Sequence, residues 1–335
     1  MATDFVALPH IPISEVRSLL FVPADRADFI RGVMRFAPDG IVFDLQDSVP
    51  RDRKSIAHRQ LPELGQMLRD GASGVENRPY MCVRINPYHA EESILEDVRA
   101  AIASGVDGVI IPEVRGLADI QGVDQCMDRL VGGTTSRRSG RPELLILCET
   151  PESIDLVDEI VDMKTVFPIA ALLYGREDLT DHLGVPLRYA VGWTEPGTLY
   201  PRLKVIWAGK RRHLPVLDST PTVISHPEII ASESIYGSDL GFTGRGCIHP
   251  AQVPVIDASY SPAEADVEWA TRALDAYQRA LQDGNSVAVS DGAMVDRPIA
   301  LLHEKCLARA DVARTHDGWK DQWRQAAQIS ASTRN

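Results

Sequence analysis

Residues 143–149 read Glu-Leu-Leu-Ile-Leu-Cys-Glu, and this stretch is the most informative one for the fold. Its five central residues are all apolar or thiol side chains, with no polar residue between them. A strand of this kind is covered on both faces, which is typical of parallel sheets and barrels. Short runs of the same kind recur along the chain, and we expect strands at Ser18–Pro23, Gly40–Leu45, Tyr80–Asn86, Gly108–Pro112, Glu143–Glu149, Ala170–Gly175, Leu214–Ser219 and Gly246–His249.

Stretches with helical spacing separate these runs, and Ala90–Ser104 and Glu152–Val161 are the clearest of them. Strands that alternate with helices in this way favour a closed parallel barrel over an open sheet. A doubly wound sheet that binds a nucleotide should carry G-x-G-x-x-G after its first strand, whereas here that strand ends in FVPADR. The sequence therefore predicts an α/β fold, a (β/α)8 TIM barrel. Residues 1–255 would form the barrel with an N-terminal tail, and residues 256–335 a C-terminal helical extension.

The extension has its own pattern of breaks. Ser261-Pro262 predicts a helix N-cap followed by proline at the first helical position, with a helix over Ala263–Leu281. Residues 286–298 (SVAVSDGAMVDRP) predict a hairpin or loop, and a further helix would begin near Ile299. The polar end of the chain from Asp321 onward is expected to fray.

The composition is that of a globular enzyme, because 44% of the 335 residues are hydrophobic and 24% are charged. The net charge of −12 argues against nucleic acid as a partner, since phosphate backbones need clustered Lys and Arg. No apolar run approaches the roughly 20 residues that span a bilayer, and no signal-peptide pattern is evident. The five cysteines are dispersed without a C-x-x-C pair, which is typical of reduced thiols. We therefore expect a cytoplasmic protein that binds neither membranes nor nucleic acid.

Ionisable side chains follow most of the predicted strands. In a TIM barrel the active site forms at the C-terminal edge of the strands. Glu149 and Asp178 each follow a buried strand, and two converging carboxylates match Mg²⁺, whose other positions are filled by water or substrate oxygens. The alternatives are an ion pair between Glu149 and Arg84, and a cap by Asp178 on a helix that starts at Leu179. The strand ends together carry Asp44, Asp47, Arg84, Asn86, Glu113, Glu149, Asp178, Asp218 and His249.

Arg84, in CVRINP, would lie at the end of the third strand. A guanidinium at the barrel mouth is suited to hold a substrate carboxylate through two parallel hydrogen bonds. Alternatively, Arg84 is the ion-pair partner of Asp44 or Glu113.

Seven stretches of the chain match a known pattern in family order, between Arg17 and about Pro298. They are RSLLFVPADR, DGIVFDLQDSVPRDRKSIAHRQL, VRINP, LLILCETPES, LLYGREDL, GRGCIHPAQV and DGAMVDRP. In these stretches the chain resembles the citrate lyase β-subunit-like branch of the HpcH/HpaI aldolase (citrate lyase) superfamily. The resemblance implies a barrel whose C-terminal extension acts as a lid and contributes to a neighbouring subunit, in a homotrimer or hexamer. It also implies a Mg²⁺ cofactor and a small carboxylic acid carried by coenzyme A (CoA) or by an acyl carrier.

The matched positions imply roles for individual residues. Mg²⁺ would be held by Glu149 and Asp178, and Arg84 would bind the substrate carboxylate. Asp44 and Asp47 match an acidic D-L-E-D-x-V motif at the substrate site. The basic residues near the phosphates of the thioester carrier would be Arg26, Lys54 and Arg59.

Two residues depart from the family pattern. Gln46 stands where Glu is usual, and Glu113, in IIPEVR, stands where the family usually has Lys. The change at Glu113 reverses a charge near the mouth, which could repel an additional substrate carboxylate or could be balanced by Arg115. Residues 193–209 also match the corresponding family helix poorly.

The implied activity is that of a carbon–carbon lyase. It would cleave a β-hydroxy acyl thioester of citryl-, malyl- or citramalyl-CoA type into an acyl thioester and a keto acid. Chelated Mg²⁺ lowers the pKa of the substrate hydroxyl, and a carboxylate general base contributes a further ~10²–10⁴-fold. Asp296, in DGAMVD, matches an acidic residue that some relatives place in a neighbouring subunit's site, and we expect it to be this base, with Asp47 as the second choice.

Three other functions stay open at this point. An acyl-CoA thioesterase could use the same scaffold. A pyruvate-type class II aldolase of the other superfamily branch typically has a His where this chain has Asp-Leu-Gln-Asp. A degenerate subunit without enzymatic activity would account for the departures from the family pattern at Gln46 and Glu113. The sequence does not indicate which hydroxy acid is used, or whether its carrier is CoA or an acyl-carrier protein.

Overall fold

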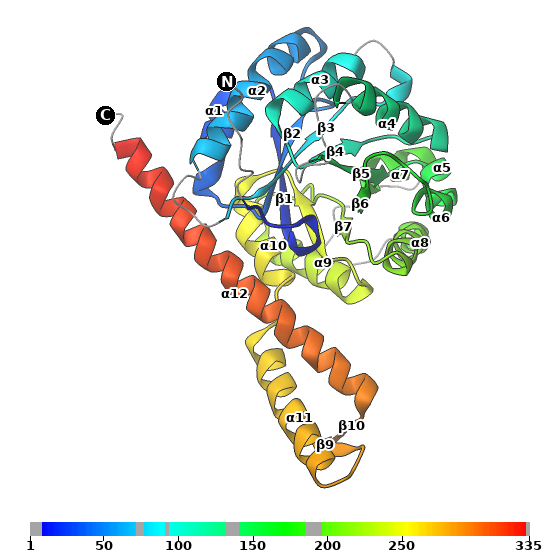
Figure 1. Ribbon diagram of the computed structural model, residues 1–335, viewed down its shortest axis with the longest axis vertical. Coiled ribbons are helices and arrows are strands. Elements are labelled where there is room, and N and C mark those ends of the chain that lie inside the picture. Colours follow the sequence, from blue (N-terminus) through cyan, green and yellow to red (C-terminus); the bar gives the residue numbers. More distant parts are fainter. Residues whose placement is uncertain (1–8, 72–76, 91–93, 132–140, 185–195, 333–335) are drawn as a thin grey trace.

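Eight parallel strands close into a barrel in the computed structural model, which describes residues 9–71, 77–90, 94–131, 141–184 and 196–332 (Figure 1). The strands follow one another around the barrel in sequence order. The first and last strands close it by pairing Ser18 with Arg245 and Leu20 with Cys247. The strands are β1 (Ser18–Pro23), β2 (Gly40–Asp44), β3 (Tyr80–Arg84), β4 (Gly108–Ile111), β5 (Glu143–Cys148), β6 (Ile169–Tyr174), β7 (Val216–Asp218) and β8 (Gly244–Cys247).

Helices connect the strands and surround the barrel (Figure 1). Among the described residues, no helix combines the length and apolar character needed to cross a membrane. The connecting helices are α1 (Ala27–Gly32), α2 (Lys54–Gly71), α3 (Ile94–Ser104), α4 (Leu117–Val131), α5 (Pro151–Asp155), α6 (Val157–Ile160), α7 (Arg176–Leu183), α8 (Pro196–Arg211), α9 (Pro227–Leu240) and α10 (Val253–Ser259). Short 3-10 turns lie at Ile13–Glu15, Val33–Arg35, Arg51–Arg53, Tyr88–Ala90 and Pro250–Gln252.

The (β/α)8 fold predicted from the sequence is confirmed, and each predicted strand is found with its ends shifted by no more than two residues. The eighth strand is displaced as a whole, because it begins at Gly244 and includes Arg245, a charged residue that the apolar pattern passed over. Arg245 is 1% exposed, and its guanidinium donates to the Ser219 carbonyl at 2.7 Å and to Glu233 at 2.7 Å. A buried charge with such partners is tolerated. The helix predicted over Glu152–Val161 is broken at Leu156 into α5 and α6.

The core has two layers, as expected when strands are covered on both faces. Side chains such as Val42, Ile110 and Leu145 fill the inside of the barrel. A larger cluster that includes Phe43, Ile146 and Phe167 lies between the strands and the surrounding helices. All five cysteines lie in the described part of the chain and are free thiols.

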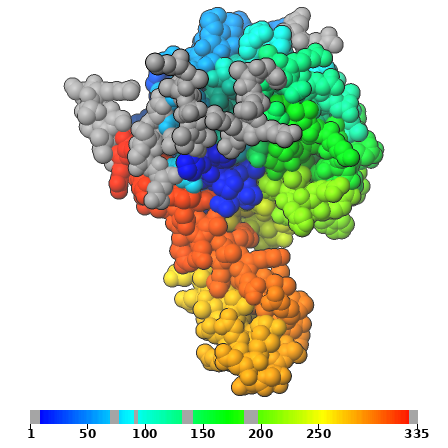
Figure 2. Space-filling view, viewed as in Figure 1, coloured from blue at the N-terminus to red at the C-terminus, as the bar shows by residue number. Residues whose placement is uncertain are grey.

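Beyond the barrel, the chain forms an arm that projects away from it (Figures 1 and 2). The arm consists of α11 (Glu264–Gln282), the antiparallel strands β9 (Ala288–Ser290) and β10 (Ala293–Val295), and the first part of α12 (Arg297–Ser332). The predicted hairpin is therefore confirmed. The expected N-cap at Ser261 is wrong, because α11 begins after Ala263, and the Ser261 hydroxyl instead accepts from Arg17 and donates to the Asp257 carbonyl. Residue 255, the expected boundary between barrel and extension, lies inside α10.

The last part of α12 packs back against the barrel, and the expected fraying from Asp321 is wrong as far as Ser332, while residues 333–335 lie outside the described residues. Trp323 is 1% exposed, belongs to the same apolar cluster as Val42 and Ile110, and donates from Nε1 to the Asn77 carbonyl at 2.8 Å. The polar sequence around it concealed this anchor, because one buried indole outweighs several solvated neighbours.

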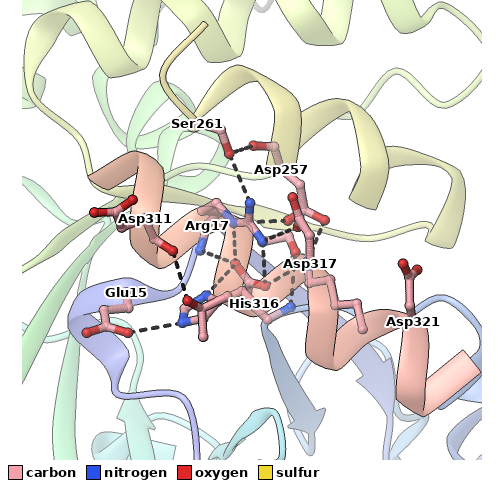
Figure 3. Close-up of polar contacts among 12 residues, drawn as sticks. Glu15, Arg17, Asp257, Ser261, Asp311, His316, Asp317 and Asp321 are labelled. Atoms are coloured by element: carbon pink, nitrogen blue, oxygen red, sulfur yellow. Dashed lines mark hydrogen bonds and ion pairs between the residues drawn. The ribbon is translucent and has the colours of Figure 1, made fainter. Parts of the chain in front are cut away.

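A buried ion network fixes α12 to the N-terminal ends of the strands (Figure 3). The Lys320 ammonium lies 2.6 Å from Asp39 and 2.6 Å from Asp257, and Arg17 donates to Asp39 at 2.8 Å and to Asp317 at 2.9 Å. Burial alone would raise the pKa of Asp39, but the charges of Lys320 and Arg17 hold it well below its usual value. Asp39 is thus a buried carboxylate that depends on its cationic partners.

Replacing Lys320 with methionine is expected to cost about 3–5 kcal/mol of unfolding free energy, because it leaves buried carboxylates short of a partner. Urea unfolding at neutral pH measures this cost. The control is Lys305→Met on the exposed part of the same helix, for which a change within about 0.5 kcal/mol is expected. Equal effects from the two variants would contradict the role given to the network.

Candidate active site

A cavity of about 460 Å³ opens at the C-terminal ends of the strands. This size suits a small organic acid with part of its carrier, and the place is the one where TIM barrels carry their active sites. The cavity is lined by Phe21, Pro23, Asp44, Asp47, Ser48, Arg84, Leu147, Glu149, Leu173, Tyr174, Gly175, Glu177, Asp178, Asp218, Ser219, Thr220, Gly246 and Ile248.

Two of the predicted residues, Glu149 and Asp178, meet in this cavity. Glu149 follows β5 and is 2% exposed, whereas Asp178 lies in the first turn of α7 and is exposed. The Asp178 carboxylate is within hydrogen-bonding reach of Glu149. Burial and the charge of Asp178 raise the pKa of Glu149 well above its usual value. The pair is an unfavourable arrangement of like charges unless a proton or a cation is shared between them.

Gly175 makes this approach possible. A Cβ atom at this position would lie 2.6 Å from both the Cβ and the Oε2 of Glu149, which is too close for any side chain. The chain therefore needs a glycine directly after β6, so that α7 can bring Asp178 close to Glu149. This explains why the stretch LLYGRED carries its glycine immediately after the apolar run.

The donor set fits Mg²⁺ better than a transition metal. No group of three or more His, Cys, Asp or Glu suitable for a metal occurs in the part of the chain that is described, so a closed zinc-type site is absent there. Mg²⁺ is commonly held by one or two carboxylates with water and substrate oxygens. The alternative ion pair between Glu149 and Arg84 is not found among the described residues, because Arg84 pairs with Asp44 and Asp47. The alternative helix cap is wrong, because α7 begins at Arg176, before Asp178.

Arg84 is oriented by two parallel hydrogen bonds to Asp44, from Nε at 2.7 Å and from Nη2 at 2.8 Å. Its third nitrogen, Nη1, lies 3.3 Å from Asp47. Asp44 is 1% exposed and also accepts from the Ser48 hydroxyl at 2.5 Å and from the backbone N–H of Gln46. Asp44 therefore has its oxygens occupied and serves to aim Arg84.

The pKa values of the two acidic residues of the D-L-Q-D motif are shifted in opposite directions. Burial alone would raise the pKa of Asp44, but the Arg84 guanidinium lowers it below its usual value. Burial raises the pKa of Asp47, as do the charges of Asp44 and Asp178, against the opposing effect of Arg84. Asp44 therefore keeps its negative charge to lower pH than Asp47, whose side chain is 66% exposed.

The three basic residues expected near the carrier's phosphates do not share one environment. The Lys54 ammonium donates to the carbonyls of Leu45 and Gln46 and to the Asn86 side chain. Arg26 pairs with an adjacent carboxylate and stacks 3.8 Å over the Phe29 ring. Arg59 is exposed on α2. Lys54 therefore supports the loop after β2, while Arg26 and Arg59 face solvent.

Asp296 is remote from the cavity within its own chain. It lies after β10 at the far end of the arm, where its Oδ1 accepts from the backbone N–H of Ile299 at the start of α12 (Figure 1). The structure thus brings together Asp44, Asp47, Arg84, Glu149 and Asp178, and places Asp296, Arg26 and Arg59 elsewhere.

One contact at the mouth was missed by the sequence analysis. Gln46 donates through Nε2 to Glu113 Oε1 at 3.0 Å, so the two residues that differ from the pattern expected from the resemblance touch each other. The backbone N–H of Glu113 donates to Glu149 at 2.8 Å. The signal in the sequence was the simultaneous change of both residues, but they are far apart along the chain.

The chain is similar to known proteins over most of its length. The HpcH/HpaI aldolase/citrate lyase family model matches residues 17–250. A citrate lyase subunit beta-like protein from Deinococcus radiodurans is 31% identical over 313 residues, which is 92% of this chain and 99% of the relative. A (3S)-malyl-CoA thioesterase from Cereibacter sphaeroides is 27% identical over 296 residues, which is 88% of this chain and 94% of the relative.

Solved structures share the fold. CitE from Mycobacterium tuberculosis, in complex with magnesium, acetoacetate and coenzyme A, has a TM-score of 0.72 at 23% identity and covers 89% of this chain and 100% of its own. The family model spans most of the barrel, and the Deinococcus relative extends the match through the arm. The chain therefore belongs to the HpcH/HpaI aldolase/citrate lyase family of enzymes.

Proposed function

We propose that the chain is a Mg²⁺-dependent lyase that cleaves a β-hydroxy acyl thioester, of citryl-, malyl- or citramalyl-CoA type, into an acyl thioester and a keto acid. The observation that carries the proposal is the Glu149–Asp178 pair beside Arg84. Two carboxylates in reach of each other, one of them buried, provide a site for a divalent cation. Arg84 lines the same cavity and provides a site for a carboxylate.

The residues divide the reaction between them. Glu149 and Asp178 would hold Mg²⁺, which lowers the pKa of the substrate hydroxyl and orients it. Arg84, aimed by Asp44, would bind the carboxylate of the departing keto acid. A carboxylate base takes the hydroxyl proton, the carbon–carbon bond breaks, its electrons pass to the thioester as an enolate, and protonation of the enolate carbon gives the acyl thioester.

The base would be Asp296 of a second copy of this chain, with Asp47 as the alternative within the same chain. The arm projects from the barrel, and Val289 and Met294 pair across its hairpin with 72% and 59% of their surface exposed. Exposed apolar side chains beside a catalytic candidate suit an interface between copies. A homotrimer or hexamer would satisfy this arrangement. The substrate's carrier, CoA or an acyl-carrier protein, would pass near the exposed Arg26 and Arg59.

The deciding experiment is turnover of citryl-CoA, (S)- and (R)-citramalyl-CoA and malyl-CoA with and without Mg²⁺, with the products resolved by mass spectrometry. Metal-dependent formation of acetyl-CoA and a free keto acid is the expected result. Absence of turnover with all four thioesters, in a protein that is folded and binds Mg²⁺, would contradict the CoA form of the proposal and shift the assay to acyl-carrier thioesters.

A second candidate, an acyl-CoA thioesterase, is favoured by the similarity to the (3S)-malyl-CoA thioesterase. In that reaction water would attack the acyl carbon, and the same pair of carboxylates would serve. The product analysis separates the two, because hydrolysis releases free CoA and leaves the hydroxy acid intact.

A further inference from the structure

Glu113 has an unusual backbone for a residue with a side chain. Its φ angle is 46°, in the left-handed region that favours glycine, and it directly follows Pro112 at the end of β4. In this conformation its N–H points to the Glu149 carboxylate, 2.8 Å away. Strained backbone of this kind is retained where the surrounding contacts impose it, and it clusters at functional sites.

The Glu113 side chain is held by several contacts. Its Oε1 accepts from Gln46 at 3.0 Å, and its Oε2 lies 3.5 Å from His89 and 3.5 Å from Arg115. Gln46 is 6% exposed, and its amide oxygen has no hydrogen-bond partner among the described residues. Turning the amide over would satisfy that oxygen no better and would direct it at the Glu113 carboxylate. The protein therefore leaves a buried acceptor unpaired to keep the Gln46–Glu113 bond.

We propose that Gln46 and Glu113 form a tether that positions Glu149 for the metal. The tether holds the backbone N–H of Glu113 on Glu149 Oε1, which fixes the carboxylate plane and leaves its other oxygen free to face Asp178. Glu113 is a positioning residue, because it acts through Glu149. The inference rests on the proposed function, since it takes Glu149 to be a ligand of Mg²⁺.

The tether also explains how the two departures from the family pattern coexist. A glutamate at position 46 would place two carboxylates at hydrogen-bonding distance, so glutamine is required opposite Glu113. Conversely, a lysine at position 113 would pair with a glutamate at position 46. The two positions thus form one unit. Glutamine opposite glutamate and glutamate opposite lysine each give an attractive contact between positions 46 and 113.

Two substitutions at the same position test the tether. Glu113→Ala removes the carboxylate and keeps the unfavourable left-handed backbone, whereas Glu113→Gly removes the same carboxylate from a backbone that glycine adopts freely. We expect Mg²⁺ affinity to fall about 10–100-fold in Glu113→Ala, the range typical of outer-shell partners, and clearly less in Glu113→Gly. Isothermal titration calorimetry with Mg²⁺, and electron paramagnetic resonance with Mn²⁺, measure binding without relying on activity.

A charge exchange provides the second test. Gln46→Glu alone should weaken Mg²⁺ binding, and the double variant Gln46→Glu/Glu113→Lys should recover most of the loss. Gln121→Leu, on the exposed surface of α4, is the matched control and should bind as the wild type does. Circular dichroism melting of the metal-free proteins verifies that each variant is folded.

The outcomes separate this inference from the proposed function. Equal losses in Glu113→Ala and Glu113→Gly, or no recovery in the double variant, would overturn the tether while leaving the metal site intact. Wild-type affinity in Glu113→Ala would overturn it as well. Failure of the wild type itself to bind Mg²⁺ or Mn²⁺ would overturn the proposed function, and the inference with it.

Discussion

Replacing Glu149 with glutamine is expected to eliminate measurable Mg²⁺ binding and to lower lyase turnover by about 10³-fold or more, because a metal ion contributes several kcal/mol to stabilising charge in the transition state. Glutamine keeps the shape of the side chain and can still accept from the Glu113 N–H, whose distance to Glu149 is 2.8 Å. The loss can therefore be attributed to the missing negative charge. Mg²⁺ titration calorimetry and the thioester assay measure the two effects.

The same variant is expected to make the metal-free protein more stable. The raised pKa of Glu149, which burial and Asp178 produce, means that its ionised form is unfavourable in the folded protein. Removing that charge should gain about 0.5–2 kcal/mol, a common gain when an active-site residue is replaced. The control Glu152→Gln removes an exposed carboxylate of α5 and should change neither property. Undiminished Mg²⁺ affinity in Glu149→Gln would place the metal elsewhere.

Replacing Asp296 with asparagine is expected to lower turnover by about 10²–10⁴-fold and to leave Mg²⁺ affinity unchanged, because it removes a general base and no ligand. Asparagine can still accept from the Ile299 N–H, 3.2 Å away, so α12 keeps its first contact. Steady-state kinetics and Mg²⁺ titration on the same preparation check both statements. Asp291→Asn, in the turn of the same hairpin, is the control and loses only an exposed ion pair with Arg272.

Mixing two inactive variants tests whether Asp296 acts in a neighbouring subunit. In a 1:1 mixture of Glu149→Gln and Asp296→Asn chains, about a quarter of the sites would combine an intact Glu149 with an intact Asp296 of another copy. Recovery of activity after subunit exchange is therefore expected. If the mixture stays inactive although the chains have exchanged, Asp296 does not act between copies. A deep loss in Asp47→Asn with little effect of Asp296→Asn would assign the base to Asp47.

The barrel could be predicted from the sequence because its strands are buried on both faces. Runs such as Leu144–Cys148 contain no solvent-facing position, so the apolar pattern marks each strand within two residues. Residues that are both polar and buried, or buried among polar neighbours, are not marked by this pattern. Arg245 lies in β8 with its charge satisfied by Glu233, and Trp323 is buried in a stretch that is otherwise polar.

Part of the candidate site could likewise be predicted from the sequence, and part could not. Glu149 and Asp178 could be placed at the barrel mouth from the sequence because each follows a buried strand, and the C-terminal ends of barrel strands converge. The ion pair between Arg84 and Asp44 was one of the alternatives that the sequence left open. The two parallel hydrogen bonds by which Asp44 aims Arg84, and the contact of Lys54 with the carbonyls of Leu45 and Gln46, could not be predicted. Both depend on side-chain directions that strand ends alone do not specify.

The sequence by itself determined the strand order, the barrel and the types of residue at its mouth, since these follow from local apolar patterning and from family motifs. Only the tertiary structure decided that Gln46 contacts Glu113, that Lys320 bridges Asp39 and Asp257, and that Asp296 lies on the arm and does not line the cavity of its own chain. These contacts join residues distant in the chain, and their energies arise from burial and geometry that exist after the barrel has closed.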